Sequence, residues 1–223
     1  QKLRDVGAYN AVQESLSRVQ SNVDVAAAAG TAISDLLIEL KEKALSASDS
    51  SLDATSRAAL NEDFVALRDQ ITTIVDNASF NGTNLINGST ATLNALANIS
   101  GTGTIAVQDE NLSLGGGVVA IATTTSITTA TLATAALALI ETSVTNLGSA
   151  LARLGSKSTA LDIHSTFVTK LQDATTAGIG NLVDADLAKE SANLQALQVK
   201  QQLGVQALSI ANSAPSIVLG FFR

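Results

Sequence analysis

The sequence contains no cysteine, no methionine and no tryptophan, one proline, one histidine and only 3% aromatic residues. Without cysteine there is no disulfide framework and no thiolate metal site. With one histidine, a zinc site of ordinary ligand spacing cannot be built within one chain. The histidine, His164, has its nearest carboxylate at Asp162, which would point to another side of a helix. We therefore predict a packing or surface role for His164, no cofactor and no enzymatic activity.

Positive charge and long apolar runs are also scarce. The chain carries 13 Lys and Arg against 20 Asp and Glu, a net charge of −7, and the basic residues are scattered. Nucleic-acid binding requires them to be clustered. The apolar stretch 135–140 is far shorter than the roughly 18 residues of a membrane span. Residues 1–20 are charged throughout and contain no signal peptide. These features predict no nucleic-acid partner, no membrane insertion, and export without a cleavable signal.

What the chain does contain is apolar residues, 46% of the total, spaced in alternating steps of four and three. This spacing places them on one stripe of a helix. The first stripe has no proline and predicts a helix of about 40 residues that ends in the Ser- and Asp-rich stretch 46–51. Its members are Val12, Leu16, Val19, Val23, Ala26, Gly30, Ile33, Leu37, Leu40 and Ala44.

The same spacing returns three more times, at 60–78, 137–168 and 183–211. The second stripe stops before the turn predicted at Asn81-Gly82. The third stripe includes Val144, and a break is predicted after it at Gly178–Gly180. The fourth is predicted to end at Pro215. Residue 1 is not Met and lies inside a helical pattern, which predicts a chain truncated at its N-terminus.

Residues 89–128 are of a different kind, rich in Thr, Gly, Ala and Ser. Short alternations of apolar and polar residues predict strands at 104–108 and 112–114, and Gly115-Gly116-Gly117 predicts a turn. This glycine run is not a phosphate loop, because no Gly-Lys-Ser/Thr follows it. The predicted fold is mainly α: an elongated antiparallel bundle of long, coiled-coil-like helices with a small β-rich insertion.

Narrow apolar stripes cannot be buried by one helix, so they must pack on each other or on other chains. The last stripe lies near the chain end and is followed by Phe221 and Phe222. An uncovered apolar surface of this kind indicates assembly. The sequence therefore predicts a protein that polymerises or oligomerises.

Two stretches resemble bacterial flagellins, the subunits of the flagellar filament. The stretch 67–88, with Phe80-Asn81-Gly82, is similar to the N-terminal signature of that family. The stretches 183–190 and 202–212 are similar to its C-terminal signature. The resemblance covers residues 1–88 and about 130–223, and leaves only the insertion unmatched.

The resemblance implies a domain plan. Residues 1–88 and 129–178 would form the two halves of a helical rod, 89–128 a variable outer segment, and 179–223 an inner-tube assembly helix. The rod core would include Leu37, Leu40, Phe64, Leu67, Ile71, Leu147, Leu151 and Leu154, and the assembly helix would use Leu187, Leu194, Leu197, Leu203 and Leu208. The implied partners are copies of the chain, an export chaperone, and hook-junction and cap proteins. The implied location is the bacterial surface.

One departure from the family concerns a patch that vertebrate innate immune receptors read on many flagellins, built around an Arg, a Glu and a Leu. The matching stretch here is Lys41-Glu42-Lys43. Glu42 is kept, whereas lysines replace the Arg and the Leu. Charge at an apolar anchor weakens binding, so weak or absent receptor activation is predicted.

Several alternatives remain open at this stage. Asp184, Asp186 and Glu190 contain no calcium-loop pattern and are interpreted as helix-end and intersubunit polar groups. Flagellins are more often O-glycosylated on outward Ser and Thr, so the resemblance makes the Thr-rich stretch 123–131 a candidate for surface glycan, equal to the Asn-X-Ser/Thr triplets. These triplets begin at Asn77, Asn81, Asn87, Asn98 and Asn111.

The second functional hypothesis is a flagellin-like surface protein that binds a polysaccharide. Its aromatic residues are few and dispersed: Tyr9, Phe64, Phe80 and Phe167. A third is a hook–filament junction protein of similar terminal architecture.

Overall fold

The structure is a computed structural model that describes the backbone of residues 2–220 and the side chains of residues 4–211. The three helices of this described part are α1 (Lys2–Ser48), α2 (Ala54–Asn77) and α3 (Ala130–Gly220). Its four strands are β1 (Ser79–Phe80), β2 (Thr83–Asn84), β3 (Thr92–Leu96) and β4 (Thr104–Gln108). The chain divides into a first unit, Gly7–Leu171, and a second unit formed by the residues on either side of it. The predicted mainly helical fold with a small β-rich insertion is confirmed.

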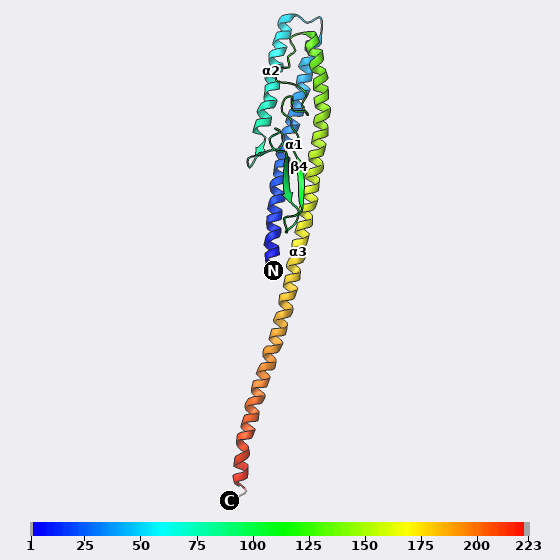
Figure 1. The fold of residues 1–223 in the computed structure, drawn as a ribbon. Coiled ribbons are helices and arrows are strands. Elements are labelled where there is room, and N and C mark those ends of the chain that lie inside the picture. The colour runs from blue at the N-terminus through cyan, green and yellow to red at the C-terminus, as the bar shows by residue number, and fades with distance from the viewer. Residues whose placement is uncertain (1, 221–223) are drawn as a thin grey trace. The chain divides into compact units, whose positions relative to one another are not determined.

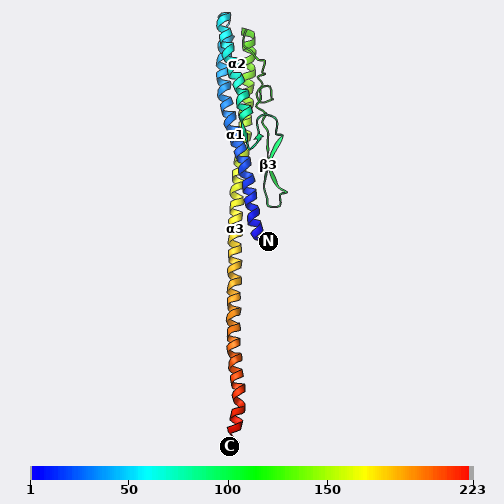
Figure 2. The same ribbon diagram turned by 90° about the vertical axis from the view of Figure 1, so that its left-hand side faces the viewer.

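The first unit is a helical bundle with one apolar core. Helix α1 runs antiparallel to α2 and to the 130–171 part of α3, and the three lie side by side (Figures 1 and 2). Each helix contributes one buried stripe, as the four-and-three spacing predicts. Fully buried members include Leu16, Ile33, Leu37, Leu40, Phe64, Ile71 and Ile140. At Gly30 a Cβ atom would lie 2.7 Å from Cδ2 of Leu151, so α1 passes close to α3 there.

The ends of α2 have clear local causes. Oδ1 of Asp53 accepts hydrogen bonds from the N–H groups of Thr55 and Ser56, both 2.9 Å, and so caps the first turn. After α2, β1 and β2 form a hairpin joined by Asn81 and Gly82, with φ of 50° and 76°. Positive φ at both central residues is the type I′ arrangement that Asn-Gly favours. The predicted turn is confirmed.

The insertion contains one longer hairpin, in which β3 pairs with β4 in antiparallel register, Ala95 opposite Ile105. The strand predicted at 104–108 is confirmed. The strand predicted at 112–114 is wrong: the Leu112 N–H donates to the carbonyl of Ile86, 2.7 Å away, in a segment that is not a strand. Leu112 is fully buried, so its apolar character reflects burial in the bundle core rather than a β alternation.

Two predicted helix ends in the C-terminal part of the chain are also wrong. Helix α3 continues through Gly178 and Gly180 and past Pro215 to Gly220. A glycine inside a helix costs about 1 kcal/mol relative to alanine. Two glycines within a long run of helix-forming residues do not cost enough to break the helix. Proline removes one main-chain hydrogen bond from a helix. Because Pro215 lies in the last two turns of α3, this loss does not end the helix before Gly220.

Within the described part of α3, Ala130–Ala211, one 18-residue window has a mean hydropathy of 1.2 and at most two charged residues. By length and composition alone this helix could cross a membrane, which the sequence reading did not anticipate. Core helices of soluble proteins reach the same values, so the window is weak evidence for a membrane span, and 28% of it is buried within the structure.

Candidate assembly surface and the anchors of the 89–128 segment

The second unit presents a long apolar surface on α3, which we call the 182–210 surface. Its ten large apolar side chains are between 51% and 75% exposed. They are Leu182, Val183, Leu187, Leu194, Leu197, Val199, Leu203, Val205, Leu208 and Ile210.

The 182–210 surface occupies more than one side of the helix. Leu203 follows Leu194 by nine residues, and at about 100° per residue the two side chains point in nearly opposite directions. They are 60% and 54% exposed, respectively. Apolar side chains on opposite sides of a helix leave water only when partners cover both sides. One partner helix could therefore cover only part of this surface.

All five residues predicted for the assembly helix lie on this surface: Leu187, Leu194, Leu197, Leu203 and Leu208. Val199, Val205 and Ile210 were not predicted; like Leu203, they fall outside the four-and-three stripe at 183–211. Their β-branched apolar character was the available signal. Phe221 and Phe222 lie outside the described residues.

The residues predicted for the rod core all lie inside the first unit. Leu37, Leu40, Phe64, Ile71, Leu147 and Leu154 are buried, and Leu67 and Leu151 are half-buried against the same core. Two polar residues share these stripes and were missed. Ser143 is fully buried where Val144 was expected, and Arg68 is only 8% exposed beside Leu67.

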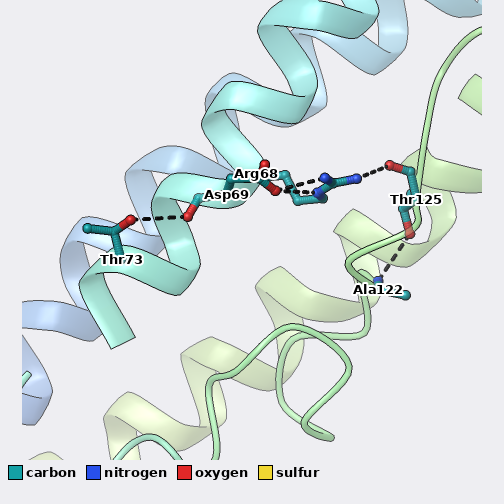
Figure 3. A network of polar contacts seen from close by, with 5 residues as sticks. All are labelled: Arg68, Asp69, Thr73, Ala122 and Thr125. Atoms are coloured by element: carbon teal, nitrogen blue, oxygen red, sulfur yellow. Dashed lines mark hydrogen bonds and ion pairs between the residues drawn. The ribbon is translucent and has the colours of Figure 1, made fainter. Parts of the chain in front are cut away.

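Arg68 and Ser143 belong to a set of helix side chains that hold the 89–128 segment by its main chain. Nη1 of Arg68 donates to the carbonyl oxygen of Thr125 at 2.8 Å. Nε and Nη2 of the same guanidinium donate to Oδ1 of Asp69, and the Ala122 N–H donates to Oγ1 of Thr125 (Figure 3). One buried arginine of α2 thus fixes the loop that leads into α3.

Further contacts of the same kind fasten the rest of the segment. The Leu96 N–H donates to Oγ of Ser15 on α1 at 3.0 Å. Nε2 of His164 on α3 lies 2.7 Å from the carbonyl oxygen of Ala97. The hairpin lies along the helices in both views (Figures 1 and 2). His164 is therefore a packing residue that holds the end of β3 against α3.

The loop beyond β4 is attached in the same way. The Ala120 N–H donates to Oγ of the buried Ser143 at 2.9 Å, and the Ile127 N–H donates to Oδ1 of Asn61 at 2.8 Å. All of these contacts pair a helix side chain with a main-chain group of the segment. The sequence offered only a weak signal for them, namely polar residues at stripe positions.

One charged side-chain pair also joins the segment to α3. Arg153 donates from Nε and Nη2 to the two carboxylate oxygens of Glu110, each at 2.6 Å. The Glu110 side chain is 11% exposed, and its hydrogen bond and charge raise the pKa of Arg153. A groove of about 430 Å³ lies beside this pair, with Val107, Leu154 and Lys157 among its lining residues.

The neighbouring Asp109 is held differently. Burial raises the pKa of its carboxyl group, while a hydrogen bond from the Gly88 N–H acts in the opposite direction. Oδ1 of Asp109 has no partner among the described residues. The segment between β4 and Leu112 therefore places one paired and one partly paired carboxylate next to each other.

The remaining candidate sites are not assembled by the fold. No cluster of three or more His, Asp or Glu capable of holding a metal exists among the described side chains, and Asp184, Asp186 and Glu190 are exposed. Phe64 is fully buried and cannot serve as a sugar platform. The other three aromatic residues of that hypothesis, Tyr9, Phe80 and Phe167, lie on separate elements.

The three residues of the predicted degenerate receptor patch lie on α1. Nζ of Lys41 is 3.1 Å from Oε1 of Glu141, and Nζ of Lys43 is 2.6 Å from Oδ2 of Asp63. The acidic partners come from α3 and α2, respectively. Both lysines are thus engaged with neighbouring helices, and Glu42 is exposed between them.

Comparison with known proteins gives consistent results over the whole chain. Residues 3–91 match the family described as bacterial flagellin N-terminal helical region, and residues 137–222 match the bacterial flagellin C-terminal helical region. The chain is 54% identical to flagellin FljM of Caulobacter vibrioides, over 97% of this chain and 78% of that protein. It is 35% identical to a flagellin of Brucella melitensis, over 98% of this chain and 80% of that protein.

Solved structures share the fold. The crystal structure of Bacillus cereus flagellin superposes with a TM-score of 0.61 at 22% identity, covering 69% of this chain and 88% of the other. A putative flagellar hook-associated protein from Vibrio parahaemolyticus also gives 0.61, at 14% identity, covering 81% and 93%. At such identities these two structures establish the fold alone.

Proposed function

This chain belongs to the bacterial flagellin family, the extracellular subunits of the flagellar filament, and from this premise we propose that the 182–210 surface is its principal assembly surface. The protein is structural, with no enzymatic role, and the family assembles by self-association. The observation that carries the proposal is the exposure of apolar side chains on opposite sides of α3, Leu194 and Leu203.

The energetic argument is direct. Burying a leucine side chain stabilises by about 1.5–3 kcal/mol. Because Leu194 and Leu203 point in nearly opposite directions, a dimer would leave one of them in water. Several neighbouring copies around each helix, as in a tubular filament, cover both. Polymerisation therefore removes more apolar area from water than pairing does.

Leu194→Asp and, separately, Leu203→Asp test this proposal. Each change places a carboxylate in a surface that becomes dry on assembly, so the critical concentration for polymerisation of the full-length protein should rise by about tenfold or more. The measurement is the fraction of protein that sediments as a function of concentration, with filaments identified by electron microscopy.

The matched control is Leu194→Met, which keeps an apolar side chain and high helix propensity and should polymerise as the parent does. Both Asp variants should retain the thermal unfolding of the monomer, since these positions are exposed there. Unchanged critical concentrations for the two Asp variants would show that this surface does not carry assembly.

For the rest of the chain we propose the family's domain plan. Residues 1–88 and 129–178 would act as the rod, 89–128 as the outward segment, and 179–223 as the assembly helix. The common core of α1, α2 and residues 130–171 supports the first assignment. Electron microscopy of filaments with a tag inserted at Gly101 tests the second, because an outward segment would display the tag on the filament surface.

We further propose that an export chaperone and the hook-junction and cap proteins bind this chain, as family resemblance implies, and that glycan is carried at 123–131. Thr123, Thr124, Thr128, Thr129 and Thr131 are exposed in this stretch. Co-purification tests the protein partners. An intact mass equal to that of the bare polypeptide, measured on protein from its native cells, would remove the glycan proposal.

A further inference from the structure

Two Asn-Gly pairs lie within seven residues of each other and have nearly the same local sequence. One is Asn81-Gly82-Thr83 and the other Asn87-Gly88-Ser89. In an unfolded chain the two should behave alike, because the residues that follow each asparagine are Gly and then a small hydroxyl residue. The fold places them in different surroundings.

The first pair is unprotected. Asn81 and Gly82 form the exposed turn between β1 and β2. The described residues offer no hydrogen-bond partner to the Asn81 side chain or the Gly82 N–H. Nothing lies within 4 Å of the place where a Gly82 Cβ would be. Each strand of this hairpin is only two residues long, so the turn opens locally at little cost.

The second pair is restrained by several contacts. Oδ1 of Asn87 accepts hydrogen bonds from the N–H and the hydroxyl of Ser89, at 2.9 and 2.5 Å. The Gly88 N–H faces the Asp109 carboxylate and lowers its pKa. Nδ2 of Asn111 lies 2.7 Å from the place where a Gly88 Cβ would be. These contacts tie down the attacking nitrogen and the amide group that it would attack.

From this contrast we infer that Asn81 is a site of spontaneous covalent modification, deamidation through a succinimide, and that Asn87 is protected from it by the fold. The main-chain nitrogen of Gly82 attacks Cγ of Asn81, the new C–N bond closes a five-membered ring, and the nitrogen loses its proton. The Asn81 side-chain nitrogen leaves as ammonia. Water then opens the ring at either carbonyl and yields aspartate or isoaspartate.

The attack requires Asn81 to leave its turn conformation, so the rate follows the population of the opened hairpin. No oxidant, enzyme or cofactor is involved. Each event adds one negative charge next to Phe80, in the hairpin that follows α2. The fraction of modified chains therefore increases with the age of the molecule.

The test is incubation of the purified full-length chain at mildly alkaline pH, with peptide mapping by mass spectrometry that separates Asn, Asp and isoaspartate at both positions. Conversion at Asn81 should be faster than at Asn87 by about tenfold or more, because the contacts around Asn87 and Gly88 must be broken first. In concentrated urea the two rates should become equal. Equal rates in the folded protein, faster conversion at Asn87, or no conversion at Asn81 would each overturn the inference.

Two variants make the test specific. Asn81→Gln should abolish the signal at position 81 and leave the rate at Asn87 unchanged, since a glutamine would have to close a larger ring. Asp109→Ala removes the carboxylate that the Gly88 N–H faces and should raise conversion at Asn87. If Asp109→Ala does not fold, the comparison of folded and urea-treated parent protein decides the question. A difference between the sites that persists in urea would assign it to sequence and overturn the role of the fold.

Discussion

At the scale of single residues, Arg68 is an unusual feature of the bundle because a guanidinium occupies a core position. It is 8% exposed, and Nη1 of its guanidinium is committed to the Thr125 carbonyl. Its acidic partner Asp69 has a side chain that is 59% exposed, so this ion pair itself contributes little. Arg68 stabilises the fold mainly by donating a hydrogen bond to the main-chain carbonyl of Thr125, which faces α2.

Arg68→Met should therefore lower the free energy of unfolding by about 1–3 kcal/mol, because it leaves the Thr125 carbonyl without its donor. The measurement is urea unfolding followed by circular dichroism. Arg18→Met is the matched control, an arginine on α1 that is exposed, and should have little effect. Equal losses in the two variants would mean that the contact with Thr125 does not matter.

At the scale of elements, the start of α2 depends on one carboxylate. Hydrogen bonds from the Ser56 hydroxyl and from the N–H groups of Ser56 and Thr55 lower the pKa of Asp53. Since the folded-state pKa lies below the unfolded value, Asp53 contributes stability above the unfolded pKa. That contribution is lost as the pH falls through the folded pKa.

Asp53→Ala should accordingly lower the thermal midpoint at neutral pH, with a difference from the parent that shrinks as the solution is acidified below the ordinary Asp range. Asp53→Asn keeps a neutral oxygen acceptor for the cap. Its advantage over Asp53→Ala should therefore persist in acid. A parent–Ala difference that is the same at all pH values would contradict the assignment.

The elements that could be predicted from the sequence are those whose apolar spacing alone determines them. The helices α1 and α2 follow from four-and-three stripes bounded by a Ser/Asp-rich stretch and an Asn-Gly turn. The predictions that failed are those in which one residue type is compatible with two kinds of structure. Leu112 and Leu114 suggested a strand by alternation, and Gly178, Gly180 and Pro215 suggested helix ends. Helix continuity depends on the sum of many residues, and isolated breakers do not decide it.

The residues of the candidate site likewise fall into those that the sequence could predict and those that it could not. Leu187, Leu194, Leu197 and Leu208 of the 182–210 surface could be named from periodicity, because an uncovered stripe is visible in sequence. The anchors of the 89–128 segment could not, since Ser15, Ser143 and His164 act on main-chain groups far away in the chain. A main-chain group has the same chemistry in every residue. No residue type in the segment therefore marks where the contact will form.

At the scale of the whole molecule, the family resemblance makes a prediction about α1, namely that Lys41 and Lys43 stand where many flagellins carry the Arg and Leu of an immune-receptor patch. Each of these lysines is paired with an acid on a neighbouring helix. An apolar anchor is thus replaced by an ammonium group that already has a partner. Engaging the receptor would require desolvating the lysines, whereas the exposed ion pairs themselves contribute little.

We predict that this chain activates a receptor reporter cell line at least several-fold more weakly than a flagellin with the Arg–Glu–Leu patch, and that the double variant Lys41→Arg, Lys43→Leu regains activity. The measurement is reporter output against protein concentration. Glu42→Ala in the double variant is the control and should remove the gain. A potent response from the parent chain would refute the prediction.

The way in which the 89–128 segment is fastened has a consequence for how such chains diverge. Helix side chains form hydrogen bonds with the peptide groups of Leu96, Ala97, Ala120, Thr125 and Ile127. Every residue except proline carries the same peptide N–H and C=O. Substitutions at exposed positions of this segment, such as Thr92 and Asn94, therefore leave its attachment intact. The exposed side chains of this segment can therefore change while the helix residues that hold its main chain stay the same.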